Sequence, residues 1–136
     1  MSEIVEVTQF KDSPVGRIPE GWEFKKLKQC LASKPEYGSG ASANPYHEGL
    51  VRYIRITDIN DEGKLDESQK VGISKADAEN KLLEKNDVLI ARTGNTVGKS
   101  YIHKADYEET AFAGYLIRFK TNPEKLSSDF LFNFTF

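Results

Sequence analysis

At 136 residues and 15.3 kDa, the chain is long enough for one domain with a real core, and too short for a nucleotide-driven motor joined to a nuclease. Its composition, 38% hydrophobic and 29% charged, is typical of a globular protein rather than a disordered or fibrous one. The formal net charge of −2 and the pI near 5.7 exclude a uniformly basic nucleic-acid binder, so such a role requires local patches.

Further classes are excluded by particular residues. A single cysteine, Cys30, rules out an internal disulfide, and His47 and His103 lack the spacing of a helical zinc pair. No apolar run approaches the roughly 18 residues that a membrane-spanning helix needs, and the N-terminus lacks the basic region of a signal peptide. We therefore expect a soluble cytoplasmic protein without a metal site.

The N-terminal half is expected to be mostly irregular. Prolines and glycines interrupt residues 1–20, which predicts an irregular lead. Residues 22–31 fit a short strand that runs into a helix or bend. Small residues predict a loop over 37–45, and the β-branched and aromatic residues of 50–57 predict a strand.

A more regular pattern follows. A turn is predicted within residues 58–65, and a helix over 74–83 with Ser74 as its N-cap. Residues 87–91 read as a short buried strand, and 92–100 as a polar loop.

The C-terminal part adds a predicted strand over residues 115–120 and a helix that begins at Ser127 or Ser128. That last segment is rich in phenylalanine up to the final residue, whereas free termini are usually polar. We expect a natural protein that continues, so that the C-terminal part is truncated here.

Charge alternates strongly along the chain. The net charges of successive blocks are −3 for residues 1–24, +4 for 25–56, −4 for 57–84, +3 for 85–105 and −2 for 106–136. Two basic blocks that fold onto one face would make an anion-binding surface with acidic flanks. Ordinary solvated surface is the alternative interpretation.

The sequence contains no complete catalytic motif. Residues 94–100 (GNTVGKS) resemble a phosphate-binding P-loop, but three residues separate the glycines instead of four and no helical pattern follows. The sequence around Asn44 resembles part of the catalytic tetrapeptide of amino-methyltransferases, without its second proline. No nucleophile elbow is present, and the acids of 58–66 lack calcium-loop spacing.

Five segments, in this order, resemble the target recognition domain of the specificity subunit of type I restriction-modification systems. They are residues 18–23 (IPEGWE), 37–43 (YGSGASA), 51–59 (VRYIRITDI), 83–100 (LEKNDVLIARTGNTVGKS) and 113–118 (AGYLIR). Each alone is weak, and the ordered set is specific. The resemblance implies an irregular lead over residues 1–16 and a recognition domain over 17–136.

The resemblance also implies a fold and a function. The fold is α+β, a single mixed-sheet globular domain with few short helices and without the coiled-coil spacer of the full subunit. The domain reads one half of a bipartite duplex DNA target and is not an enzyme on its own. Its partners are double-stranded DNA and the modification and restriction subunits, with no membrane. S-adenosylmethionine, ATP and Mg belong to those partner subunits, so the chain has no cofactor.

Candidate DNA contacts come from the two basic blocks. They are Tyr37, Ser39, Ser42, Arg52 and Arg55 from the first, and Arg92, Thr93, Asn95, Thr96, Lys99 and Ser100 from the second. Asn95 suits adenine and Arg92 suits guanine. Arg52 and Arg55 are three positions apart and should point to opposite faces of a strand. For residues 93–100 a structural turn is the alternative.

Two functional alternatives remain open at this point. One is the recognition domain of a fused restriction–methylation enzyme, which shares this domain type. The other is a protein-interaction remnant or decoy that does not bind DNA.

Overall fold

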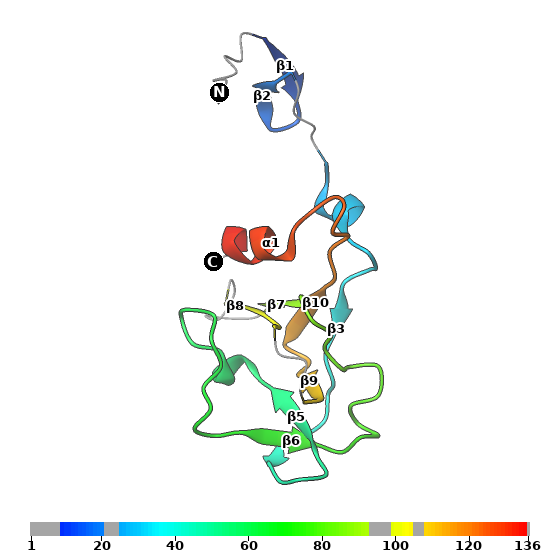
Figure 1. The fold of residues 1–136 in the computed structure, drawn as a ribbon, viewed down its shortest axis with the longest axis vertical. Helices are drawn as coiled ribbons and strands as arrows, with labels where there is room; N and C mark the ends of the chain where they lie inside the picture. Colours follow the sequence, from blue (N-terminus) through cyan, green and yellow to red (C-terminus); the bar gives the residue numbers. More distant parts are fainter. Residues whose placement is uncertain (1–8, 21–24, 93–98, 105–107, 136) are drawn as a thin grey trace, which may run out of the picture.

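The computed structural model describes residues 9–20, 25–92, 99–104 and 108–135 (Figure 1). Strands dominate this part of the chain, which contains one α-helix and two short 3-10 helices. The strands form a two-stranded hairpin and two four-stranded sheets. This mixture agrees with the predicted α+β class, with the strand pairing divided between two sheets.

The hairpin near the N-terminus consists of β1 (Phe10–Ser13) and β2 (Gly16–Pro19), which pair antiparallel. The side chain of Ser13 closes the turn, since its Oγ donates to the Gly16 carbonyl at 2.5 Å and accepts from the Val15 amide at 3.3 Å. Gly16 has a φ of +113°, which favours glycine. The prediction of an irregular lead is therefore wrong for residues 10–19, where proline and glycine mark a hairpin turn.

One four-stranded sheet is antiparallel throughout, in the order β3 (Glu36–Tyr37), β10 (Leu116–Phe119), β7 (Val88–Ala91) and β8 (Ser100–Ile102). β7 and β10 confirm two predicted strands, whereas β3 and β8 were not predicted. The helix α1 (Ser128–Thr135) packs against β7 and β8 (Figure 1).

The other four-stranded sheet has the order β4 (Asn44–Pro45), β6 (Val71–Ile73), β5 (Val51–Ile54) and β9 (Thr110–Phe112). β5 and β9 are parallel and the other pairs are antiparallel. The strand predicted over residues 50–57 is confirmed in its first half and then gives way to the 3-10 helix Ile56–Asp58. β4, β6 and β9 were not predicted.

The core lies on both faces of β5. Val51 and Tyr53 contribute to one buried cluster, and Ile54 contributes to another. The first cluster is completed by Ile73, Ala78 and Ala111, and the second by Ile59, Leu89, Ala91, Tyr101, Phe112 and Leu116. Burial on both faces explains why the β5 sequence is nearly continuous in large residues.

The helix predicted over residues 74–83 does not form. Its N-cap does, because the Ser74 Oγ accepts from the Asp77 amide at 3.2 Å. The chain then turns at Asn80, whose φ is +64°. The Leu83 amide donates to the Thr110 carbonyl at 2.7 Å, so this segment pairs beside β9 instead of continuing a helix. Tertiary pairing thus overrides local helix propensity.

Two other helical predictions fare better. α1 is confirmed, and the Ser127 Oγ accepts from the Phe130 amide at 3.4 Å as its cap. Within the ambiguous segment 22–31, a 3-10 helix spans Leu27–Cys30. None of the helices in the described residues is both long and apolar enough to cross a membrane.

Candidate nucleic-acid interface

A groove of about 550 Å³ lies between the end of β5, the small-residue loop before β4, and the turn between β9 and β10. Its lining residues are Ser39, Gly40, Ala41, Ala43, Tyr53, Arg55, Ile56, Thr57, Arg92, Ala113, Gly114 and Tyr115. Two arginines and no carboxylate are among them. The groove therefore joins the small-residue loop of the first basic block to Arg92 of the second.

The hydroxyl of Tyr53 fixes the small-residue loop by hydrogen bonding. This buried side chain comes from β5, and its hydroxyl donates to the Ser39 carbonyl at 2.8 Å and the Ala41 carbonyl at 3.0 Å. Burial raises the pKa of the Tyr53 hydroxyl above its ordinary value of 10.0, so the hydroxyl stays protonated and keeps donating. The loop is thus a positioned wall of the groove.

Close backbone approach also fixes the loop. A side chain at Gly38 would place its Cβ 2.2 Å from the Ala113 carbonyl oxygen, which no real contact tolerates. Glycine at this position lets the loop run beside residues 112–114, where the Ser39 amide donates to the Phe112 carbonyl at 2.8 Å. The sequence requirement for Gly38 is therefore steric.

Arg92 is held at the groove by three contacts. Its backbone amide donates to the Tyr115 carbonyl at 3.2 Å, and its Nε donates to the Gly114 carbonyl at 3.2 Å. Its guanidinium carbon lies 4.7 Å from the centroid of the Tyr37 ring. Tyr37 and Tyr115 are themselves 57% and 63% exposed. An exposed cation thus lies with two exposed aromatic rings at one place on the surface.

Arg55 also lines the groove, but Asp58 neutralises it. The guanidinium donates to both carboxylate oxygens, from Nε to Oδ2 at 3.1 Å and from Nη2 to Oδ1 at 3.0 Å. These hydrogen bonds raise the pKa of the Arg55 guanidinium. Asp58 also accepts from the Arg55 amide at 2.8 Å, which starts the 3-10 helix after β5. Arg55 therefore contributes to the shape of the groove, while Asp58 offsets its positive charge.

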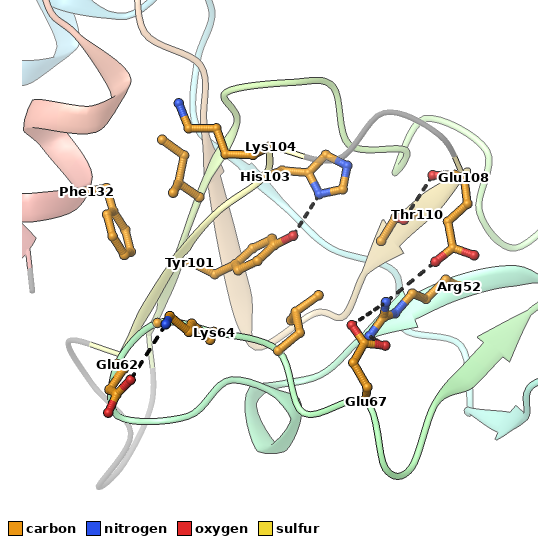
Figure 2. A pocket seen from close by; sticks show the side chains of 13 residues that line it. Arg52, Glu62, Lys64, Glu67, Tyr101, His103, Lys104, Glu108, Thr110 and Phe132 are labelled. Atoms are coloured by element: carbon orange, nitrogen blue, oxygen red, sulfur yellow. Dashed lines mark hydrogen bonds and ion pairs between the residues drawn. The ribbon is translucent and has the colours of Figure 1, made fainter.

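Arg52 lies in a different pocket, of about 410 Å³, shown in Figure 2. It is 7% exposed, and its guanidinium lies 3.0 Å from Glu67 and 3.5 Å from Glu108. The prediction that Arg52 and Arg55 point to opposite faces agrees with their two pockets. A buried arginine with two carboxylates does not support the predicted DNA contact at Arg52.

The remaining predicted contacts divide by position. Ser42 is exposed on the small-residue loop, whereas Ser39 is buried and its Oγ accepts from the Ala41 amide at 3.1 Å. Lys99 precedes β8, and its carbonyl accepts from the Ala91 amide at 2.8 Å, which puts Lys99 at the same end of the sheet as Arg92.

Ser100 is buried, and its Oγ has no hydrogen-bond partner among the described residues, so its position does not support a DNA contact. The predicted contacts Thr93, Asn95 and Thr96 lie outside the described residues.

Tyr53, Gly114 and Tyr115 also shape the groove, but they are not among the contacts predicted from the sequence. Tyr115 was assigned to a strand, although it stands just before β10 and is exposed, and Gly114 was read only as part of a family segment. Tyr53 was read as a strand residue without its role as a hydrogen-bond donor. The alternation of β10 gives one signal, because Tyr115, Ile117 and Phe119 share the more exposed face.

Within the described residues, no group of three or more histidine, cysteine, aspartate or glutamate side chains is placed to hold a metal ion. No protein-family model matches the sequence.

Proposed function

We propose that the chain is a sequence-specific DNA-binding module, the target recognition domain of a type I restriction-modification specificity subunit, which reads one half of a bipartite duplex target. The observation that carries this proposal is the groove at Arg92. Two arginines line this groove. Arg55 forms an ion pair with Asp58, whereas Arg92 forms none with a described carboxylate and lies over the exposed Tyr37 ring.

The comparison between the two pockets supports this choice of surface. The pocket at Arg52 is lined by three glutamates as well as by basic residues, so its field is mixed. The groove at Arg92 carries no acid in its lining and lies next to the sheet end that holds Lys99. A polyanion is attracted to the second surface and not to the first.

The proposed roles separate phosphate contacts from base contacts, as is general in protein–DNA interfaces. Lys99 contacts phosphates and sets the position of the domain. Arg92, Tyr37 and Ser42 face the bases and supply sequence preference. The module itself performs no reaction, and the methyl-transfer and cleavage chemistry, with its S-adenosylmethionine, ATP and Mg, belongs to partner subunits.

Selection from random duplexes tests the proposal. The chain is used alone at low ionic strength and together with the modification subunit of its system, and bound duplexes are sequenced over several rounds. We expect an enriched half-site of defined sequence. Lys64→Ala is the matched control, because Lys64 is an exposed lysine that lines the pocket at Arg52 and, among the described residues, forms an ion pair only with Glu62 at 4.0 Å.

Two results would overturn the proposal. In one, neither arm of the selection enriches any sequence. In the other, the chain binds the modification subunit but the pair selects no duplex, which is the behaviour of a protein-interaction remnant.

A further inference from the structure

The arginines among the described residues differ in whether a carboxylate forms an ion pair with them. Arg52, Arg55 and Arg118 each lie within 3.0 Å of a carboxylate oxygen. Arg92 is exposed and has no carboxylate within ion-pair distance among the described residues. An arginine that is restrained but not neutralised is arranged to meet an acceptor from outside the chain.

The restraint on Arg92 also selects which of its donors remain. A guanidinium has five N–H donors, and Nε is used by the Gly114 carbonyl at 3.2 Å. The Tyr37 ring covers one face of the plane at 4.7 Å. Within the described residues the two Nη groups have no hydrogen-bond partner, and they present a flat fork of paired donors on a restrained side chain.

Tyr37 is in turn held firmly enough to orient Arg92. Its backbone pairs with Ile117 in the β3–β10 ladder, and its carbonyl accepts from Lys81 Nζ at 2.7 Å. The ring is 57% exposed because β3 lies at the edge of its sheet. Tyr37 is therefore a positioning residue for the guanidinium.

We propose that Arg92 reads one guanine in the duplex through its two Nη groups, with Tyr37 and the Gly114 carbonyl as positioning groups. This inference rests on the proposed DNA-binding function. Guanine is the base whose major-groove edge offers two neighbouring acceptors, O6 and N7, and a planar fork matches them bidentately. A phosphate contact would need only a mobile charge, which a lysine on a flexible stem provides as well.

The test uses the half-site that the wild-type chain selects, in the same complex. Each guanine of that site is replaced in turn by 7-deazaguanine, which lacks the N7 acceptor but keeps base pairing. We expect one position at which wild-type affinity falls by about 5- to 150-fold. In Arg92→Ala the same replacement should change affinity by less than about twofold, because no side-chain donor remains at position 92 to meet N7.

Two further variants control the experiment. Arg17→Ala is matched to Arg92→Ala, since Arg17 also lies over an aromatic ring, 5.6 Å from the Phe10 centroid, but in the β1–β2 hairpin. It should retain the full guanine effect. Tyr37→Leu should weaken that effect while the domain still melts cooperatively, which separates positioning of the guanidinium from loss of the fold.

The outcomes separate the two proposals. A selected site without guanine, or one where no 7-deazaguanine weakens wild-type binding, overturns the role of Arg92 and leaves DNA recognition standing. So does an Arg92→Ala variant that keeps the guanine effect, or one that weakens binding to every duplex equally, as loss of a phosphate contact would. Absence of any selected site overturns DNA recognition and the role of Arg92 with it.

Discussion

Replacing Tyr53 by phenylalanine removes the hydroxyl that holds the groove loop and leaves the ring in place. The lost interactions are the donations to the carbonyls of Ser39 at 2.8 Å and Ala41 at 3.0 Å. Ser39 is buried, so its carbonyl has little access to a replacement water. The expected loss is about 1–2 kcal/mol in the free energy of unfolding at neutral pH, measured by urea denaturation.

The dependence on pH gives the same prediction a second, sharper readout. Because the folded-state pKa of Tyr53 is raised above 10.0, the unfolded chain loses this proton first. The stabilisation is fully present below about pH 10 and is lost as the pH rises through the folded pKa, by at most about 1.4 kcal/mol per pH unit. The stability gap between wild type and Tyr53→Phe should therefore shrink as the pH rises above about 10.

Tyr115→Phe is the matched control, because Tyr115 is 63% exposed and should leave unfolding within about 0.5 kcal/mol of wild type at every pH. The reasoning is refuted if Tyr53→Phe is as stable as wild type near pH 7. It is equally refuted if the gap between the two proteins stays constant up to pH 11.

Three further substitutions probe the interface and its support. Lys99→Ala should weaken binding to all duplexes alike and lower the slope of log affinity against log salt by about one, and an unchanged slope in a salt titration would contradict a phosphate contact. Gly38→Ala forces a Cβ to within 2.2 Å of the Ala113 carbonyl, and should cost about 1–3 kcal/mol in urea melts, whereas wild-type stability would show that the loop moves freely. Asp87→Ala removes the buried carboxylate that Lys120 approaches at 2.9 Å and that accepts from the Glu84 amide at 2.8 Å; a loss of about 1–3 kcal/mol is expected, and wild-type stability would argue against a structural role for this carboxylate.

Within the two four-stranded sheets, the sequence predicts the strands that are four residues long, β5, β7 and β10. β7 and β10 lie within one sheet, and β5 has clusters on both faces, so each shows a dense apolar run. The strands that were missed in these two sheets are only two or three residues long and derive their structure from partners: β4 contains a proline, and β3 pairs through two residues. Short edge pairings leave little local pattern.

The candidate site shows the same division. The charge pattern left open whether the two basic blocks share a face, and the groove brings Ser39 and Arg55 of the first block together with Arg92 of the second. Charge type alone did not distinguish Arg52, which is buried with Glu67 and Glu108, from Arg92, which is exposed. Those carboxylates are distant in sequence, so only the folded chain reveals which arginine is neutralised.

The ratio of affinities for the selected half-site and for a scrambled duplex of equal composition tests the central claim most directly. It is measured by fluorescence anisotropy, with the modification subunit present, over a range of salt concentrations. Sequence-specific recognition predicts a ratio of about 10³ or more that persists as salt is raised. A ratio near one at every salt concentration would contradict it.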